Sequence, residues 1–444
     1  MAESESWNAR LAIASLCERG KIWDGFAKKR PLEFRINTWK LSLLPVFSLI
    51  ARTEAAIPMR FLLYSHDGLG LGHTRRHLAI ARALNRLAPK ASVLLATGTD
   101  DVNRLGLPAQ VEILKLPSLR KIQNGEYASR RLQIPTAEIR EMRSALLATT
   151  VRSFRPSVAV VDRYPFGAKG EFREALLALK KIGGKAVLGF RDILDSRDSV
   201  LAEWEPENLQ EQISEHFDRL LIYGLPSVFD PLKEYDLPSL RKRTTFCGYL
   251  VNEDLVEPSR PSVLAVNKKI RPIVLATAGG GEDGFALLET FMRAAENAPW
   301  QGVLVSGPML PEDKLDLLKD LALKTGTQLH SFVPQLSTWL CSADALVSMG
   351  GYNTMAEAVS CGMPTVCVPR VSPRTEQLIR SLAFEKMGLV KNLHPHELTV
   401  KTLRKAIAEI LAQPRDALLK RAMSSLDFDG ASRAARCLIE LAQP

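Results

Sequence analysis

Short apolar runs alternate with amphipathic segments along most of the chain. The runs are apolar almost throughout, as expected for strands covered on both faces of a parallel sheet. Between them lie helical patterns such as Thr74–Ala88, where apolar residues recur every three positions. The predicted strands are Arg60–Ser65, Ser92–Thr97, Val158–Asp162, Ala186–Phe190, Arg219–Tyr223, Pro272–Thr277, Gly302–Ser306, Gln328–Phe332, Ala345–Met349 and Thr365–Pro369. This alternation predicts a doubly wound α/β architecture.

The series of strands and helices starts twice. Each half opens on a strand followed by a glycine cluster, and the stretch between them, Tyr249–Lys269, is polar and weakly patterned. We therefore expect two Rossmann-like domains facing a cleft, over residues 59–247 and 248–444, with the last helix packing back on the first domain. Residues 1–58 precede Met59, which stands directly before the first strand. An upstream start codon or a poorly ordered extension would explain them equally well.

Composition narrows the class of protein. Hydrophobic residues make up 46% and charged residues 24% of the 444 positions, which is typical of a globular chain. The longest apolar candidate, Leu41–Ala51, is shorter than the roughly 18 residues that span a bilayer. The six cysteines form no CxxC pair and have no histidine at metal spacing, which argues against a zinc site and favours a reducing compartment. We expect a soluble cytoplasmic protein.

The net charge of +10 is unevenly distributed. Residues 59–246 hold 29 Lys and Arg against 22 Asp and Glu, whereas residues 247–444 hold 21 of each kind. A basic first half could meet an anionic membrane, a phosphate-bearing substrate or nucleic acid, although scattered solvated side chains would explain it as well. The candidate contributors are Arg75, Arg76, Arg120, Lys121, Arg130, Arg131, Arg140 and Arg143.

The first glycine cluster, His66–Arg76, follows a strand and opens a helix, where free N–H groups favour an anion. Its GxGxG spacing differs from the GxGxxG of dinucleotide folds, which disfavours a nicotinamide or flavin enzyme. His73 stands at the start of the helix, where the dipole favours a neutral imidazole that could act as a general base. The alternative is a helix-start histidine without a chemical role.

The second cluster, Thr277–Gly284, also lies between a strand and a helix, so its backbone could approach a phosphate. Two such loops, one per domain, predict a bipartite site for a phosphorylated ligand. A third segment, Ser348–Pro369, reads as strand, glycine turn, helix, tight turn and strand. Its Glu357 falls one turn into the helix, where a carboxylate could accept paired hydrogen bonds from a diol or merely complement the helix dipole.

The third segment resembles the donor-binding signature of GT-B glycosyltransferases of family 28, which include the bacterial lipid-I N-acetylglucosaminyltransferase. The resemblance covers roughly residues 59–444 and is strongest at 328–380 and at His66–Arg76. It implies a glycosyltransferase without a metal or other cofactor, which moves a sugar from a nucleotide sugar, expected to be a UDP-sugar, to a hydroxyl with inversion. The donor residues that it implies are Gly279, Gly280, Gly281, Phe332, Val333, Gly350, Gly351, Asn353, Thr354, Glu357, Glu376 and Gln377.

The resemblance also assigns the acceptor side and the base. His73 is the leading base, with Asp67 and Asp192 as substitutes or orienters. Residues that close strands of the first domain should reach the edge of the cleft and meet the acceptor, unless they form surface ion pairs. The acceptor-side candidates are Gly70, Gly72, Arg75, Arg76, Asp162, Arg163 and Asp192.

The chain departs from the family pattern in two loops. The usual Gly-Gly-Thr-Gly-Gly-His loop is replaced by the longer His66–His73, and the phosphate loop lacks its serine. These differences argue against a peptidoglycan role and favour a less characterised group of predicted glycosyltransferases. The acceptor is expected to be lipid-linked or part of cell-surface polysaccharide synthesis, with the enzyme at the inner face of the plasma membrane.

Two other functions remain open. A sugar-nucleotide 2-epimerase shares the two-domain architecture, and a non-catalytic sugar-nucleotide-binding protein would retain Glu357 and Gln377 but could dispense with His73. Nucleic-acid binding is not expected, because aromatic residues are only 7% and no RNA- or DNA-binding module is recognisable.

Overall fold

The structure is a computed structural model with side chains. It describes residues 59–66, 72–99, 102, 106–121, 127–251, 271–333 and 336–443, with only the backbone at Lys121. These residues belong to one compact unit, Pro58–Pro444. The predicted extension 1–58 and the candidates Asp67 and Gly70 lie outside the described residues.

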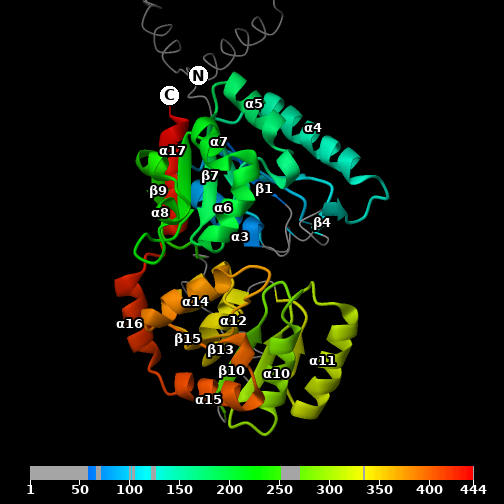
Figure 1. The fold of residues 1–444 in the computed structure, drawn as a ribbon, viewed down its shortest axis with the longest axis vertical. Helices are drawn as coiled ribbons and strands as arrows, with labels where there is room; N and C mark the ends of the chain where they lie inside the picture. The colour runs from blue at the N-terminus through cyan, green and yellow to red at the C-terminus, as the bar shows by residue number, and fades with distance from the viewer. Residues whose placement is uncertain are drawn as a thin grey trace, which may run out of the picture. The chain divides into compact units, whose positions relative to one another are not determined.

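The first half of this unit, which we call the N-lobe, is built on a seven-stranded parallel sheet of order β3-β2-β1-β6-β7-β8-β9 (Figure 1). Its strands are β1 (Arg60–Ser65), β2 (Ser92–Thr97), β3 (Val111–Lys115), β6 (Val158–Asp162), β7 (Lys185–Arg191), β8 (Arg219–Tyr223) and β9 (Thr244–Phe246). Its helices are α3 (Gly72–Leu87), α4 (Thr136–Phe154), α5 (Arg173–Lys181), α6 (Arg197–Trp204), α7 (Leu209–His216) and α8 (Pro231–Glu234). A small antiparallel hairpin pairs β4 (Leu119–Lys121) with β5 (Tyr127–Ser129).

The second half, which we call the C-lobe, has a six-stranded parallel sheet of order β12-β11-β10-β13-β14-β15. Its strands are β10 (Ile273–Thr277), β11 (Gln301–Val305), β12 (Gln328–His330), β13 (Ala345–Ser348), β14 (Thr365–Cys367) and β15 (Lys391–Asn392). Its helices are α10 (Phe285–Ala295), α11 (Glu312–Thr325), α12 (Leu336–Ser342), α13 (Tyr352–Ser360), α14 (Glu376–Lys386), α15 (Val400–Leu411) and α16 (Arg415–Ser425). No described helix is long and apolar enough to cross a membrane.

The two sheets confirm the predicted doubly wound α/β class. Strand β1 lies between β2 and β6, and β10 lies between β11 and β13, so the strand order reverses beside the first strand of each lobe. Loops that leave the carboxyl ends of the strands diverge at such a point and leave a crevice. The segments that follow β1, β6 and β7 therefore meet at one edge of the N-lobe sheet.

The last helix, α17 (Gly430–Ala442), returns to the N-lobe and packs beside α3. One apolar cluster joins residues of both lobes, among them Leu78 of α3, Met355 of α13, Phe384 of α14 and Leu438 of α17. Burial of this shared cluster stabilises the lobes against each other.

The chain passes between the lobes twice, and the two passages touch. A Cβ on Gly430 would stand 2.6 Å from the carbonyl oxygen of Tyr249, so only glycine fits there. The ring of Tyr249 also stacks on Tyr352 of α13, with centroids 5.8 Å apart.

Candidate active site

A cavity of about 500 Å³ opens between residues of the two lobes. The N-lobe wall comes from the start of α3, from residues after β6 and from the last residue of β7. The C-lobe wall comes from the glycine loop after β10, the start of α13 and the start of α14. Both walls therefore consist of strand ends and helix N-termini, where backbone N–H groups lack partners within the helix. Helices α10 and α13 begin after Gly284 and Gly351, which supply no side-chain cap.

His73 and Asp162 form a hydrogen-bonded pair on the N-lobe wall. The Nδ1 atom of His73, in the first turn of α3, lies 2.9 Å from Oδ2 of Asp162 at the end of β6. Arg76 donates to the same oxygen at 2.7 Å. The carboxylate is fully buried and the histidine side chain is 13% exposed. The sequence spacing of 89 residues conceals this pair, which exists because β1 and β6 are neighbours in the sheet.

Burial and the neighbouring charges together set the protonation of this pair. Burial favours the neutral acid, but Arg76 and His73 outweigh it and hold the pKa of Asp162 well below its usual range. Burial lowers the pKa of His73 to about 4, against the opposing effect of Asp162. Near neutral pH a neutral imidazole therefore faces a carboxylate. Nδ1 of His73 also lies 2.9 Å from Nη2 of Arg76, which can only donate. We assign the Nδ1–H tautomer, because Arg76 already donates to Asp162 and the ionised carboxylate accepts the ring proton, so the lone pair belongs to Nε2.

Two further aromatic residues extend the wall beyond His73. The ring of His66 contacts His73 edge-on, with centroids 4.4 Å apart, and contacts Tyr164 with centroids 4.7 Å apart. Burial lowers the pKa of His66 well below its usual value, so it is neutral. His66, His73, Tyr164 and Arg163 all line the cavity.

The glycine loop after β10 is held by a second loop of the C-lobe. A Cβ on Gly281 would stand 2.4 Å from the carbonyl oxygen of Ser306, and Gly281 has a φ of +98°. The amide of Met309 donates to the carbonyl of Gly280 at 2.9 Å. The close approach of the two loops leaves no room for a side chain at Gly281. The glycine loop lines the cavity just before α10 begins.

Most predicted donor residues gather around the cavity. Those in its lining are Gly279, Gly280, Gly281, Phe332, Val333, Gly351, Asn353, Thr354, Glu376 and Gln377. Gly350 and Glu357 are not part of the lining. On the acceptor side, Gly72, Arg75, Arg76 and Arg163 line the cavity, whereas Asp162 and Asp192 lie behind it.

Glu357 is covered by an arginine from the opposite lobe. Arg75 of α3 donates to its Oε1 at 2.6 Å, and the carboxylate side chain is only 5% exposed. Its Oε2 is buried and has no partner among the described residues. A ligand that binds Glu357 must therefore move Arg75 or use the second oxygen.

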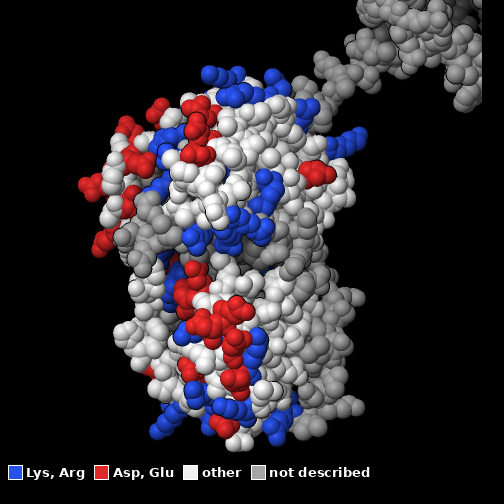
Figure 2. All heavy atoms as spheres, turned by 90° about the vertical axis from the view of Figure 1, so that its right-hand side faces the viewer, with Lys and Arg blue, Asp and Glu red and all other residues white. Residues whose placement is uncertain are grey.

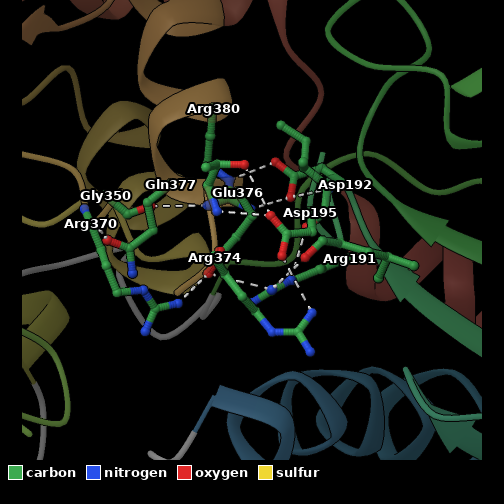
Figure 3. A network of polar contacts seen from close by, with 12 residues as sticks. Arg191, Asp192, Asp195, Gly350, Arg370, Arg374, Glu376, Gln377 and Arg380 are labelled. Atoms are coloured by element: carbon green, nitrogen blue, oxygen red, sulfur yellow. Dashed lines mark hydrogen bonds and ion pairs between the residues drawn. The ribbon is translucent and has the colours of Figure 1, made fainter. Parts of the chain in front are cut away.

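Glu376 and Gln377 open α14 and face a group of arginines (Figure 3). Arg370 donates to Oε1 of Glu376 at 2.7 Å, and Arg191 lies 3.5 Å from the same oxygen. Burial raises the pKa of Glu376, but the charges of Arg191 and Arg370 outweigh burial, so the pKa lies below its usual value. The side-chain oxygen of Gln377 accepts from the amide of Arg370 at 3.0 Å, which orients the amide nitrogen away from that loop.

Two N-lobe carboxylates after β7 hold α14 in place, as Figure 3 shows. Both oxygens of Asp192 accept from Arg380, at 2.6 and 2.8 Å, and both side chains are 1% exposed. Oδ1 of Asp195 accepts from the amide and hydroxyl of Thr375 at 2.8 and 3.0 Å. Asp192 was a candidate for the acceptor, but both its oxygens bind Arg380. The sequence carries no signal for these contacts, because the partners are about 180 residues apart.

Two predicted contributors to a basic surface are wrong. Arg76 is only 3% exposed, and its guanidinium donates to the buried Asp162. Arg143 is fully buried, and its Nε donates to Oε2 of Glu171 at 2.6 Å. It therefore supports the inner face of α4 rather than a surface. Among the described residues, no three His, Cys, Asp or Glu side chains are grouped so that they could hold a metal ion.

The C-terminal part of the chain matches a known domain. Residues 297–435 match the model of the glycosyltransferase family 28 C-terminal domain. Among curated relatives, the NDP-glycosyltransferase YjiC of Bacillus licheniformis is 27% identical over 46% of this chain and 47% of that protein. An uncharacterized glycosyltransferase of Methanosarcina mazei is 24% identical over 82% of this chain and 95% of that protein. A UDP-N-acetylglucosamine–N-acetylmuramyl-(pentapeptide) pyrophosphoryl-undecaprenol N-acetylglucosamine transferase of Bacillus pumilus is 29% identical over 32% and 40%.

Solved structures share the fold over most of the chain. The calicheamicin glycosyltransferase CalG4 matches with a TM-score of 0.55 at 17% identity, over 87% of this chain and 98% of that one. A putative UDP-N-acetylglucosamine 2-epimerase of Listeria monocytogenes matches with a TM-score of 0.59 at 12% identity, over 86% and 96%. These likenesses confirm the predicted GT-B architecture of two Rossmann-like domains. The matched domain model confirms the resemblance to family 28. The alignments with the YjiC proteins of two Bacillus species span about half the length of those relatives.

Proposed function

From the GT-B fold and the family 28 C-terminal domain, we propose that this chain is an inverting glycosyltransferase that moves a sugar from a UDP-sugar to a hydroxyl. The observation that carries the proposal is the placement of a neutral histidine, hydrogen-bonded to an ionised aspartate, across one cavity from two uncapped helix N-termini and a glycine loop. The first group can accept a proton and the second can bind a diphosphate.

The chemistry follows from that placement. Nε2 of His73 takes the proton of the acceptor hydroxyl, and Asp162 stabilises the imidazolium that forms. The acceptor oxygen then bonds to the anomeric carbon from the face opposite the diphosphate, whose bond to that carbon breaks with the electron pair. N–H groups of the loop Gly279–Gly281 and of α10 stabilise the departing diphosphate. Glu376 and Gln377 hold hydroxyls of the sugar.

The choice of uridine rests on the chain's resemblances. A relative named for UDP-N-acetylglucosamine is similar to part of this chain. Phe332 and Val333, which the resemblance assigns to the donor, line the cavity. The nucleotide sugar is a co-substrate and not a resident cofactor.

A 2-epimerase is the second candidate, because a putative enzyme of that class shares the fold. An epimerase would need no acceptor. Its product would be an epimerised UDP-sugar, and UDP release would not depend on an acceptor. Incubating the full chain with a panel of UDP- and other NDP-sugars, with and without hydroxyl acceptors, separates the functions. We expect UDP release that depends on an acceptor. Epimerised nucleotide sugar, or binding without turnover, would contradict a transferase.

Glu357 is the proposed ligand of the ribose hydroxyls. Replacing Glu357 with alanine should weaken UDP binding by about tenfold or more, since hydrogen bonds to a charged group contribute about 1.5–3 kcal/mol. Titration calorimetry with UDP measures the effect, and Glu409→Ala, which removes a half-exposed carboxylate on α15, is the matched control. A folded Glu357→Ala variant with unchanged UDP affinity would remove Glu357 from the donor site.

The N-lobe surface further supports contact with an anionic membrane. In Figure 2, Lys and Arg side chains lie along the top and across the middle of the face shown, while Asp and Glu gather at its upper left and in a stripe on its lower part. Exposed large apolar residues of the N-lobe lie on α4 and after the β4–β5 hairpin: Leu132, Met142 and Leu146. The exposed arginines of these elements and their ends are Arg120, Arg130, Arg131, Arg140, Arg152 and Arg155. Apolar side chains among basic ones favour an anionic lipid surface.

We predict salt-sensitive sedimentation of the full chain with anionic vesicles and none with neutral vesicles. Each basic residue near such a surface contributes about 1 kcal/mol. Reversing Arg130 and Arg140 to glutamate should therefore weaken binding by at least about tenfold. Reversing Lys401 and Lys405, on the far C-lobe helix α15, is the control and should have little effect. Equal and negligible sedimentation with both vesicle types would exclude the membrane surface as a partner.

A further inference from the structure

The cavity is unusually rich in arginine, and most of these arginines are paired with carboxylates. Its lining contains Arg75, Arg76, Arg163, Arg191, Arg370 and Arg374. Arg75 pairs with Glu357, Arg76 with Asp162, Arg191 and Arg370 with Glu376, and Arg374 with Glu203. Among the described residues, Arg163 has no carboxylate within ion-pair distance. Its guanidinium instead lies over the ring of Tyr164, 4.7 Å from the centroid.

The backbone holds Arg163 in a conformation that side-chain-bearing residues rarely adopt. Its φ is +70°, and its amide donates to the carbonyl of Gly189 on the neighbouring strand at 2.8 Å. A bulky residue in the left-handed region costs free energy, and such residues are concentrated at binding sites. Arg163 directly follows Asp162, the partner of His73. The end of β6 therefore positions Asp162 and also places Arg163 in the cavity lining.

Arg191 adds a second positive charge at the end of the adjacent strand, β7. Its guanidinium donates to the carbonyls of Ile193 and Leu194. Within the described part of the chain it forms one ion pair, 3.5 Å long, with an oxygen of Glu376, and Arg370 lies closer to that oxygen, at 2.7 Å. Burial, and after it the charge of Arg163, lower the pKa of Arg191 to about 9. Positive charge therefore exceeds negative charge at this part of the wall, and a bound anion would offset it.

We propose that Arg163, with Arg191 beside it, forms an anion-binding subsite that recognises a carboxylate or phosphate on the acceptor. The inference rests on the proposed transferase function, because it takes His73 as the atom that meets the acceptor hydroxyl. Arg163, Tyr164, His66 and His73 form one continuous row of contacts on the N-lobe wall. The glycine loop proposed for the donor diphosphate belongs to the other lobe. An acceptor with its hydroxyl at His73 thus extends its anionic group toward Arg163, whose planar guanidinium can donate two parallel hydrogen bonds.

The test uses two small phenols and one inorganic anion as probes, with the full chain saturated with UDP. The probes are 4-hydroxybenzoate, its uncharged analogue 4-hydroxybenzamide, and inorganic phosphate, each titrated by calorimetry or NMR. The parent should bind the benzoate about tenfold more tightly than the benzamide and should also bind phosphate. In Arg163→Gln that preference should disappear while UDP affinity stays within twofold. Arg163→Lys keeps the charge but not the planar guanidinium, so its preference for the benzoate should lie between those of the parent and Arg163→Gln.

Arg241→Gln is the control, because it removes an exposed arginine of the same lobe that is not part of the cavity lining. The proposal is overturned if the parent binds no anion, or if Arg241→Gln loses as much affinity as Arg163→Gln. It is also overturned if Arg163→Gln loses UDP affinity in the same proportion, since the anion would then be the donor's diphosphate. Failure of the transferase function has its own readout, which is absent UDP binding or absent acceptor-dependent UDP release. In that case the anion titrations are repeated without nucleotide, so the subsite is still tested.

Discussion

Replacing His73 with alanine should lower the rate of sugar transfer by about a hundredfold or more while UDP affinity stays unchanged. Loss of a positioned general base costs about 10²–10⁴ in rate. The histidine touches Asp162 and Arg76 rather than the glycine loop of the C-lobe, so donor binding should not depend on it. Turnover is measured by UDP release with a UDP-sugar and an acceptor that the parent uses.

His396→Ala is the matched control, since it removes an exposed histidine that is not part of the cavity lining. The pH profile gives a second readout. Burial lowers the pKa of His73 to about 4, and a base is active only when deprotonated. Activity of the parent should therefore hold as the pH falls from 7 and decline only near pH 4. Turnover of His73→Ala within a few-fold of the parent would show that the base lies elsewhere.

Replacing Asp192 with alanine should lower the free energy of unfolding by about 3 kcal/mol or more. The change leaves the guanidinium of Arg380 buried without a carboxylate, and removing one partner of a buried ion pair costs about 3–5 kcal/mol. Chemical denaturation of the full chain measures the loss. Because Arg380 belongs to the helix that begins with Glu376 and Gln377, affinity for the nucleotide sugar should fall as well.

Asp236→Asn provides the comparison for Asp192→Ala. Asp236 pairs with Arg197, and both side chains are about half exposed, so loss of the charge should cost less than about 1 kcal/mol. Asparagine is used because it tolerates the φ of +54° at this position. A loss in Asp192→Ala no larger than that of Asp236→Asn would mean that the pair between the lobes does not stabilise the fold.

The sequence alone predicted the architecture with little error. The predicted strands Arg60–Ser65, Ser92–Thr97, Val158–Asp162 and Arg219–Tyr223 coincide with β1, β2, β6 and β8. Central strands of a parallel sheet are buried on both faces, so their apolar runs are long and distinct. The short strands β3, β9 and β15 and the β4–β5 hairpin were not predicted, because these elements are short or half-exposed and leave weaker patterns.

The sequence also singled out the loops and the kinds of residue that line the cavity, because glycine loops and helix starts leave local signals. It could not show which distant side chains pair. His73 with Asp162, Arg75 with Glu357 and Asp192 with Arg380 are separated by 89, 282 and 188 residues. Such pairs depend on strand order and on the fit between lobes. Burial then decides which charges are neutralised, and only the tertiary structure distinguishes Arg163 from the paired arginines around it.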